Sequence, residues 1–339
     1  MTRYNVGVVG ATGMVGQKIL QILEERRFPY SGLKLLASSR SAGRKIKVGS
    51  REYQVEEACS LAFEGVDLAF FSAGGDTSKE LVPEAVKRGT IVIDNSSAFR
   101  MSDDVPLVIP EVNPEAVEDH RGIIANPNCS TIQMVVVLQP LHREAMIKRV
   151  VVSTYQAISG AGREAIGELK SQSGSYLEGD EVKAEYVPYR GAARNYQLAF
   201  NLVPQIDVFD EDGYTREELK MIHETRKIMG LPDLPITATT VRVPVFVGHS
   251  ESINIEFERE LSPEKAHEIF NKAAGIIVSD DPGNLIYPTP LEMADRDETF
   301  VGRIRKDRSV RHGLNIWVVA DNLRKGAATN SVQIAELLL

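Results

Sequence analysis

Hydrophobic and polar residues alternate in blocks along the first 130 residues of the chain. Helical spacing of the apolar positions predicts helices over residues 14–26 and 77–88. Short, continuously apolar stretches predict strands over residues 4–9, 33–37, 67–72 and 90–94. Strands that are apolar on both faces are typical of a parallel sheet with helices on both sides. The pattern therefore predicts an α/β fold whose N-terminal domain is doubly wound.

The second half has longer strand-like stretches in which apolar and polar residues partly alternate. Strands are expected over 150–156, 236–244, 252–258, 299–305 and 314–320, and helices over 163–177, 215–229 and 263–273. This mixture is typical of an α+β domain on a mixed or mostly antiparallel sheet, which leaves one face open to a dimer interface. A last helix, expected over 325–339, is compatible with a return to the first domain, and residues 179–203 show no clear periodicity.

Composition narrows the class of protein. A chain of 339 residues suits two domains. The net charge of −8 argues against nucleic acid as a partner, since such proteins carry a basic face. Only two cysteines are present, so we expect a reducing compartment rather than a disulfide framework. With no signal-peptide pattern and no apolar run of the ~20 residues that cross a bilayer, we expect a cytoplasmic protein that does not bind membranes.

A glycine-rich turn joins the first predicted strand to the first predicted helix. Gly10, Gly13 and Gly16 recur every third residue there. Glycine permits a tight turn and close approach of the backbone to a pyrophosphate, which the helix N-terminus then receives. In this strand–turn–helix context the pattern predicts a Rossmann-type dinucleotide site. Ser72 and Gly74 follow another predicted parallel strand, where the cofactor crevice is expected.

The end of the second predicted strand indicates which dinucleotide binds. An NAD site usually has an acidic residue there for the ribose hydroxyls. Residues 36–45 contain no carboxylate, whereas Arg40 and the serines Ser38 and Ser41 suit a 2′-phosphate. NADP(H) is therefore favoured, and a solvated basic loop is the alternative.

Cys129 lies in the sequence Asn-Pro-Asn-Cys-Ser-Thr, just before a largely apolar helical run. A thiol in the first turn of a helix faces unpaired backbone N–H groups and the positive end of the helix dipole. This environment lowers the pKa of a cysteine and makes a nucleophilic thiolate available. The alternative is a small residue packed at a strand-to-helix turn.

Three further segments stand out: residues 94–100 end in Arg100, residues 153–162 end a strand in a glycine-rich turn, and residues 240–250 contain Arg242 and His249. Together with the features above, the chain resembles the aspartate-β-semialdehyde dehydrogenase family. The matching motifs extend from residue 7 to residue 336 and read GATGMVG, FFSAGG, DNSSAFR, NPNCST, STYQAISGAG, VRVPVFVGHSES and DNLRKGAATNSVQIAE.

The resemblance implies a reaction on L-aspartyl 4-phosphate. Cys129 attacks the acyl phosphate, inorganic phosphate leaves, and NADPH reduces the resulting thioester to L-aspartate 4-semialdehyde. His249 resembles the general acid/base, since an imidazole titrates near the working pH. Gln156 resembles the residue that orients the substrate or acyl intermediate. The metabolic role implied is biosynthesis of lysine through diaminopimelate, and of threonine, methionine and isoleucine.

The resemblance also implies further contacts. Arg242 resembles the ligand of the substrate carboxylate, for which its planar guanidinium is suited. Glu217 resembles the ligand of the substrate ammonium, although a solvated ion pair with Lys220 is the alternative. The phosphate ligands implied are Arg100 and Lys220, and Asn128 is expected to orient the leaving phosphate or oxyanion. The cofactor contacts implied are Thr12, Gly13, Met14, Val15, Arg40, Ser41, Ser159, Gly160 and Asn322.

We therefore expect an NADP-binding domain over residues 1–128, joined by a C-terminal helix over 322–339. Residues 129–321 are expected to form the catalytic and dimerisation domain of a homodimer or dimer of dimers. No cluster of histidine, cysteine and carboxylate residues has metal-ligand spacing, so no metal is expected. Cys59 matches no motif and is expected to be structural.

Other functions remain open at this stage. N-acetyl-γ-glutamyl-phosphate reductase performs the same chemistry, but its cysteine motif has glycine where this chain has Asn128. Phosphorylating glyceraldehyde-3-phosphate dehydrogenase has a different cysteine motif and an NAD-type acidic residue. A non-catalytic NADPH sensor on the same fold has no need of Cys129 and His249. A Cys/His hydrolase without a cofactor leaves the glycine turn unexplained.

Overall fold

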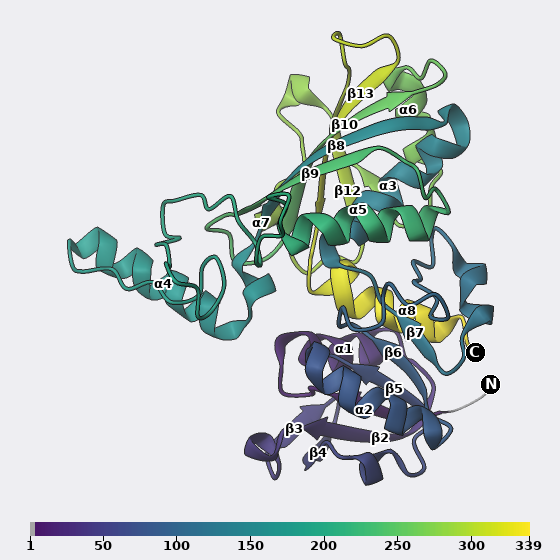
Figure 1. Ribbon diagram of the computed structural model, residues 1–339, viewed down its shortest axis with the longest axis vertical. Helices are drawn as coiled ribbons and strands as arrows, with labels where there is room; N and C mark the ends of the chain where they lie inside the picture. The colour runs from purple at the N-terminus through teal and green to yellow at the C-terminus, as the bar shows by residue number, and fades with distance from the viewer. Residues whose placement is uncertain (1–3) are drawn as a thin grey trace. The chain divides into compact units, whose positions relative to one another are not determined.

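The computed structural model describes residues 4–339, and the chain divides into two compact units (Figure 1). The first unit contains the described residues up to Asn128 together with Gly326–Leu339. The second unit is Cys129–Lys325. Each unit is built on its own sheet. No helix within residues 4–339 is long and apolar enough to cross a membrane.

The first unit has a seven-stranded sheet in the order β3-β4-β2-β1-β5-β6-β7. Every neighbouring pair is parallel except β3 and β4. Its strands are β1 (Tyr4–Val9), β2 (Tyr30–Ala37), β3 (Lys45–Val48), β4 (Arg51–Glu57), β5 (Leu68–Phe71), β6 (Ile91–Asp94) and β7 (Ile123–Ala125).

Helices cover both faces of this sheet. On one face, α1 (Met14–Glu25) and α8 (Thr329–Glu336) share an apolar core with the strands. On the other face, α2 (Gly75–Lys87) packs through Leu81, Val82 and Ala85. The prediction of a doubly wound α/β domain is therefore confirmed.

The strand order reverses beside β1. The chain passes from β1 to β2 on one side and later places β5 on the other. The carboxyl ends of β1 and β5 are therefore neighbours at the switch point, where open α/β sheets bind ligands.

The hairpin of β3 and β4 was not predicted from the sequence. Both strands are mostly exposed and polar, and their apolar residues alternate over only a few positions, which is too short a run to indicate a strand by itself. The C-terminal helix also differs from its expected span. Residues Arg324–Ala328 form π-helical turns, and the α-helix itself begins only at Thr329.

The second unit has a six-stranded sheet in the order β11-β12-β13-β10-β8-β9. Parallel pairs (β8 with β9, β11 with β12) and antiparallel pairs occur together, so the expected mixed sheet is confirmed. Its strands are β8 (Ile147–Gln156), β9 (Ile236–Arg242), β10 (His249–Phe257), β11 (Ile276–Val278), β12 (Thr299–Lys306) and β13 (Gly313–Ala320).

Three helices of this unit pack against the sheet: α3 (Cys129–Ala145), α5 (Arg216–Met229) and α6 (Pro263–Phe270). The capping box of Thr215 and Glu218 fixes the start of α5. The short helix α7 (Pro290–Met293) contacts β13.

Residues 179–203 follow α4 (Arg163–Glu178) as an irregular segment (Figure 1). The side chain of Gln172 on α4 satisfies its backbone, since Oε1 accepts hydrogen bonds from the N–H groups of Leu198 and Ala199. Val187, Leu198 and Val203 add a small apolar cluster against the helix. Because α4 supplies these contacts, the segment itself needs no periodic pattern.

Candidate active site

Cys129 is the first residue of α3 and is partly buried. The preceding residues Asn126–Asn128 connect the helix to β7. The first N–H groups of a helix have no intrahelical acceptor, and they place partial positive charge near this sulfur. The position predicted for Cys129 is thus the one the chain adopts.

His249 contacts this sulfur. The Cys129 Sγ lies 3.3 Å from His249 Nε2. On the other side of the ring, the backbone N–H of Ala157 donates to His249 Nδ1 at 3.0 Å. Because Nδ1 accepts, the hydrogen of the neutral ring is on Nε2 and points toward the sulfur. The backbone therefore selects the tautomer that donates to Cys129.

Burial governs the charge of His249. Its side chain is fully buried, and this burial together with the Arg242 cation lowers the pKa of His249 to about 3. The expectation that this imidazole titrates near the working pH is therefore wrong for the ligand-free chain. The strand expected over residues 252–258 begins earlier, at His249, as β10.

Gln156 and Arg242 lie at the ends of two neighbouring strands. They are register partners in the parallel pair of β8 and β9, so both side chains reach the same edge of the sheet. Arg242 Nη1 donates to the carbonyl of Ala157 at 2.6 Å. Burial lowers the pKa of the Arg242 guanidinium, while the Glu217 carboxylate and Cys129 raise it. Arg242 is thus a buried cation beside the cysteine.

Helix α5 brings a carboxylate and an ammonium to the same edge. Gln156 Nε2 donates to Glu217 Oε1 at 3.2 Å. Lys220 Nζ lies 3.1 Å from Glu217 Oε2 and 3.2 Å from Asp207 Oδ2. Glu217 is buried, whereas Lys220 is partly exposed. The alternative of a solvated ion pair therefore does not describe Glu217, which also binds an amide in the protein interior.

Three residues predicted to contact the cofactor lie around His249. A side chain at Gly160 would lie 3.2 Å from Arg242 Nη1 and 3.7 Å from His249 Nε2, so glycine leaves room at the ring. Asn322 Nδ2 donates to Ser159 Oγ at 3.0 Å, and Asn322 Oδ1 accepts from the N–H of Gly248 at 3.0 Å. Within the second unit these residues adjoin the cysteine–histidine pair.

In the glycine turn of the first unit, the backbone of the turn lies close to the end of β5 and to the start of α1. Gly10 has φ of +81°, and a Cβ there would lie 2.8 Å from the carbonyl oxygen of Ser72 at the end of β5. At Gly16 a Cβ would collide with Gly10 and Ala11, so the helix packs directly on the turn. Gly13 is the N-cap of α1, Thr12 precedes it, and Met14 and Val15 form the first turn; Gly13 is exposed and the other three are partly buried.

The predicted 2′-phosphate residues follow β2 directly. Ser38, Arg40 and Ser41 form or flank a 3-10 turn, and the Arg40 side chain is exposed. Gly74 is exposed at the start of α2, after β5. Among residues 4–339, no three histidine, cysteine, aspartate or glutamate side chains are grouped as a metal ion requires.

Arg100 is held in the first unit by backbone carbonyls. Its Nε donates to the carbonyl of Asn126 at 2.9 Å, and its Nη2 donates to the carbonyl of Asn95 at 2.8 Å. Both Arg100 and Asn128 are buried. The arginine is therefore fixed against the first residue of the NPNCST sequence.

Three polar residues of the catalytic unit were missed by sequence reasoning. Asp207 binds Lys220, and Gln133 and Glu251 are buried side chains on the elements that carry Cys129 and His249. Glu251 lies within the matched segment VRVPVFVGHSES, which was one available signal. Asp207 lies between the expected elements, so nothing in the sequence pairs it with Lys220.

Comparison with known proteins gives a consistent result over the whole chain. The model described as "Semialdehyde dehydrogenase, NAD binding domain" matches residues 5–120, and the one described as "Semialdehyde dehydrogenase, dimerisation domain" matches residues 138–325. Aspartate-semialdehyde dehydrogenase of Aquifex aeolicus is 58% identical, with 99% of this chain and 98% of the relative covered. The Bacillus subtilis protein of the same name is 53% identical, with 98% and 97% covered.

A solved structure agrees with these sequence matches. It is aspartate semialdehyde dehydrogenase II of Vibrio cholerae complexed with ASA, which superposes with a TM-score of 0.95 at 44% identity. The match covers 100% of this chain and 98% of that one.

Proposed function

This chain belongs to the aspartate-semialdehyde dehydrogenase family, and on that premise we propose that Cys129 is the nucleophile of an NADPH-dependent reduction of L-aspartyl 4-phosphate. The observation that carries this assignment is the contact between Cys129 Sγ and His249 Nε2 at 3.3 Å. A hydrogen-bond donor at this distance, together with the helix N-terminus, stabilises a thiolate.

Cys129 forms and breaks the covalent bond to the substrate. The thiolate attacks the acyl carbon, the bond from that carbon to the phosphate oxygen breaks, and inorganic phosphate leaves a thioester on Cys129. Bound NADPH supplies the hydride that reduces this thioester. The C–S bond then breaks, the aldehyde C=O forms, and the sulfur is again a thiolate. We propose that His249 Nε2–H, which faces the sulfur, donates to the oxygen that carries negative charge before this collapse.

The strand ends and α5 supply the substrate contacts. Arg242 is a buried cation suited to the α-carboxylate, and Glu217 is a buried carboxylate suited to the α-ammonium. Gln156 donates to Glu217 and is the register partner of Arg242, so its amide is suited to orient a substrate held by these two charges. Lys220 and Arg100 are proposed to bind the phosphate, with Asn128 next to the nucleophile.

A nicotinamide dinucleotide fits the switch point of the first unit. The tight turn that the positive φ of Gly10 permits, and the exposed Gly13 at the start of α1, suit a pyrophosphate. NADP(H) is proposed over NAD(H) because Arg40, Ser38 and Ser41 follow β2 and residues 36–45 lack a carboxylate. Ser159, Gly160 and Asn322 remain predicted contacts from the second unit. Only two cysteines in 339 residues suit a reducing compartment, here proposed as the cytoplasm.

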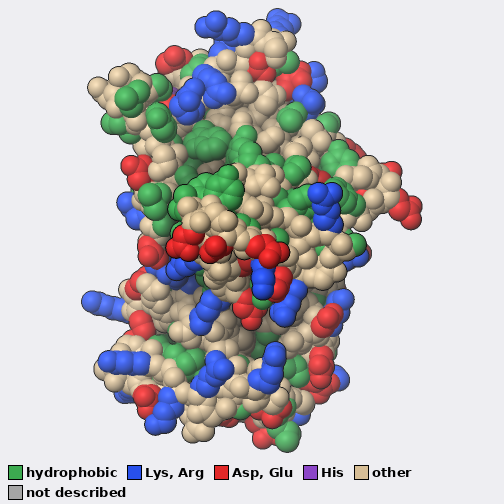
Figure 2. Space-filling model, turned by 90° about the vertical axis from the view of Figure 1, so that its left-hand side faces the viewer, with side chains coloured by type: hydrophobic (Ala, Val, Ile, Leu, Met, Phe, Trp, Pro, Cys, Tyr) green, Lys and Arg blue, Asp and Glu red, His purple; other side chains and the backbone are tan. Residues whose placement is uncertain are grey.

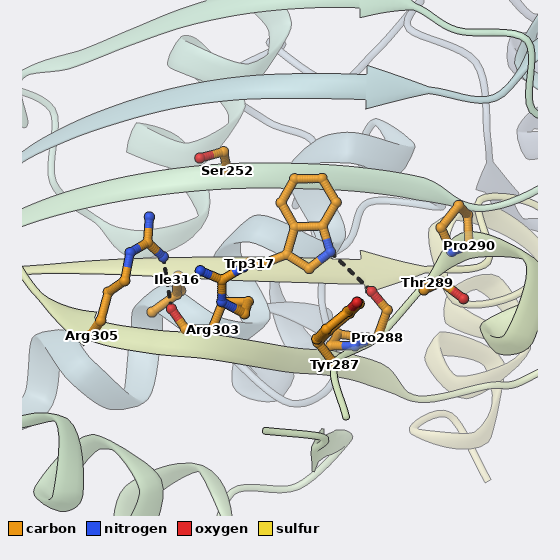
Figure 3. A pocket seen from close by; sticks show the side chains of 9 residues that line it. All are labelled: Ser252, Tyr287, Pro288, Thr289, Pro290, Arg303, Arg305, Ile316 and Trp317. Atoms are coloured by element: carbon orange, nitrogen blue, oxygen red, sulfur yellow. Dashed lines mark hydrogen bonds between the residues drawn. The ribbon is translucent and has the colours of Figure 1, made fainter. Parts of the chain in front are cut away.

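A homodimer is proposed through the face of the second sheet that α3, α5 and α6 do not cover. Tyr155 and Trp317 pack together on that face, with ring centroids 5.5 Å apart. A pocket of about 320 Å³ adjoins Trp317, whose Nε1 donates to the carbonyl of Pro288 (Figure 3). The matched dimerisation model spans these residues.

Apolar side chains on the surface of the second unit support the same proposal (Figure 2). A patch of this kind is typical of an obligate interface. Large exposed hydrophobic residues of this unit are Met146, Tyr176, Leu177, Phe200, Leu202, Phe209, Phe246, Leu285, Ile286, Tyr287 and Leu291.

The test is to trap the acyl-enzyme. Mixing the protein with L-aspartate 4-semialdehyde and NADP⁺ without phosphate is expected to give one equivalent of NADPH in a burst. Mass spectrometry should then find the aspartyl adduct on the peptide that contains Cys129. The variant Cys129→Ser should bind NADPH normally and give neither signal. Steady turnover by that variant would overturn the assignment.

A further inference from the structure

Two buried polar side chains of the second unit have no role in the reaction as described. Glu251 has no exposed surface, and Gln133 is 1% exposed. None of their four side-chain oxygen and nitrogen atoms forms a hydrogen bond with another described residue. Buried polar atoms of this kind cost free energy unless they are paired.

The two side chains lie on the elements that hold the catalytic pair. Gln133 follows Cys129 by four residues on α3, and Glu251 follows His249 by two residues on β10. Four helical residues rise ~6 Å and two strand residues ~6.7 Å, so the steps along the two elements match. Both pairs lie on the faces that α3 and β10 turn toward each other, since i, i+4 and i, i+2 residues share a face.

Among residues 4–339, no cation forms an ion pair with Glu251 or lowers its pKa. Thr154 on β8 and Val318 on β13 are its register partners, and neither titrates. Burial raises the pKa of Glu251 well above its ordinary value, and the adjacent Gln133 amide is the one group that opposes this effect. Burial thus favours the protonated carboxyl, which has one O–H donor and one carbonyl acceptor.

We propose that neutral Glu251 and Gln133 pair as acid and amide, and that this pair sets the positions of Cys129 and His249 relative to each other. The Glu251 O–H donates to Gln133 Oε1, and Gln133 Nε2–H donates to the Glu251 carbonyl oxygen. This pairing satisfies all the orphaned groups except one amide hydrogen. The two residues are positioning residues, because neither touches the substrate or the reacting sulfur.

The consequence for the reaction follows from the placement of the pair, and it rests on the proposed roles of Cys129 and His249. The Cys129–His249 contact is between the first residue of a helix and the first residue of a strand, where few backbone hydrogen bonds restrain either one. The Glu251–Gln133 pair, one helical turn after Cys129 on α3, restrains how closely α3 approaches β10. Misplacing a reacting group by ~1 Å can cost 100-fold in rate.

The experiment exchanges the two side chains in the full-length protein. Glu251→Leu and Gln133→Leu each remove one partner of the pair. Glu251→Gln replaces the acid by an amide that can still pair with Gln133. The double variant Gln133→Glu/Glu251→Gln restores an acid–amide pair with the two positions exchanged. For each variant, kcat and KM are measured, together with the pH profile of Cys129 alkylation by iodoacetamide. The infrared difference spectrum between the parent protein and Glu251→Gln reports a protonated carboxyl.

Each leucine variant is expected to lose ~10- to 100-fold in kcat with little change in the KM for NADP⁺, and to shift the alkylation profile. The double leucine variant should lose no more than one of them, and the exchanged pair should recover most of kcat. The infrared band of a protonated carboxylic acid should disappear in Glu251→Gln.

Full activity in both leucine variants, losses that add in the double variant, or absence of the infrared band would overturn the proposal. Failure of the proposed function can be distinguished from failure of the acid–amide proposal. It would appear as turnover in Cys129→Ser, independently of the results for the Glu251 and Gln133 variants. If a leucine variant does not fold, the exchanged pair and Glu251→Gln still decide the outcome by their kcat and alkylation profiles.

Discussion

The backbone N–H of Ala157 determines the tautomer of His249 and thereby what this ring presents to Cys129. Because the N–H of Ala157 donates to His249 Nδ1, a second proton on the ring would place two N–H groups against each other. The ring therefore stays neutral and presents Nε2–H to the sulfur. His249 then acts in the ligand-free chain as a hydrogen-bond donor to Cys129 rather than as the imidazolium of an ion pair.

The depressed pKa of His249 predicts a pH dependence of stability. The pKa is about 3 in the folded chain and ~6.5 in the unfolded chain, so only the unfolded chain gains a proton on this residue as the pH falls through that range. The stability is fully present above pH ~6.5 and decreases below it by up to ~1.4 kcal/mol per pH unit. We expect His249→Gln to lose less stability than the parent protein between pH 6 and pH 4 in urea unfolding.

The control for that comparison is His223→Gln, which replaces an exposed histidine on α5. If His249→Gln and the parent protein lose stability equally over this pH range, His249 is not buried as a neutral base.

Residues differ in how far the sequence predicts them. Cys129 was placed correctly, because a helix start follows from local sequence. The protonation of His249 and the contact of Lys220 with Asp207 could not be predicted, because they depend on how separate elements fold together. Asp207 reaches Lys220 only through the irregular segment before α5, and the burial of His249 and its contact with the N–H of Ala157 follow only from the assembled sheet.

At the scale of elements, the turn between β1 and α1 requires glycine at position 10 for two separate reasons. Its φ of +81° is strained for any residue with a side chain, and the carbonyl of Ser72 occupies the space of a Cβ. The glycine spacing in the sequence predicts the positive φ. The lack of room for a Cβ beside Ser72 follows only from the pairing of β1 with β5.

Replacing Gly10 by alanine is expected to weaken both folding and cofactor binding. Gly89→Ala is the matched control, since its φ is +83° and nothing lies within 4 Å of the added Cβ. Both variants should lose ~1–2 kcal/mol of stability from the positive φ, and Gly10→Ala should lose more from the clash. Titration with NADPH should show weaker binding for Gly10→Ala alone. Equal affinity in the two variants would remove the turn from the cofactor site.

Elements with a strong apolar signal were predicted well, and exposed ones were not. The continuous apolar strands β5 and β6 are buried on both faces, so they could be identified without knowing the fold. The strands β3 and β4 are mostly exposed, and their alternating apolar residues extend over only a few positions. The segment 179–203 is held by side chains of α4 and shows no periodic pattern of its own.

At the scale of the whole molecule, the uncovered sheet face predicts a dimer. Trp317→Glu and Val151→Glu each place a charge on that face, where both parent side chains are half-buried. Burying an unpaired charge in an interface is costly, so both variants should sediment as monomers while the parent protein sediments as a dimer. Lys47→Glu changes the charge of an exposed strand in the first unit and should leave the dimer intact. Dimers in both sheet-face variants would place the interface elsewhere.

The central claim is that this chain interconverts L-aspartyl 4-phosphate and one particular semialdehyde, L-aspartate 4-semialdehyde, through Cys129. The most direct measurement is phosphate-dependent reduction of NADP⁺, followed by the absorbance of the nicotinamide, with L-aspartate 4-semialdehyde as substrate. N-acetylglutamate 5-semialdehyde, NAD⁺ and Cys129→Ser are run in parallel. The account predicts activity that requires phosphate, aspartate semialdehyde and Cys129 together and that is higher with NADP⁺ than with NAD⁺. Turnover only with the acetylated substrate, or tight NADPH binding without turnover of either aldehyde, would contradict it.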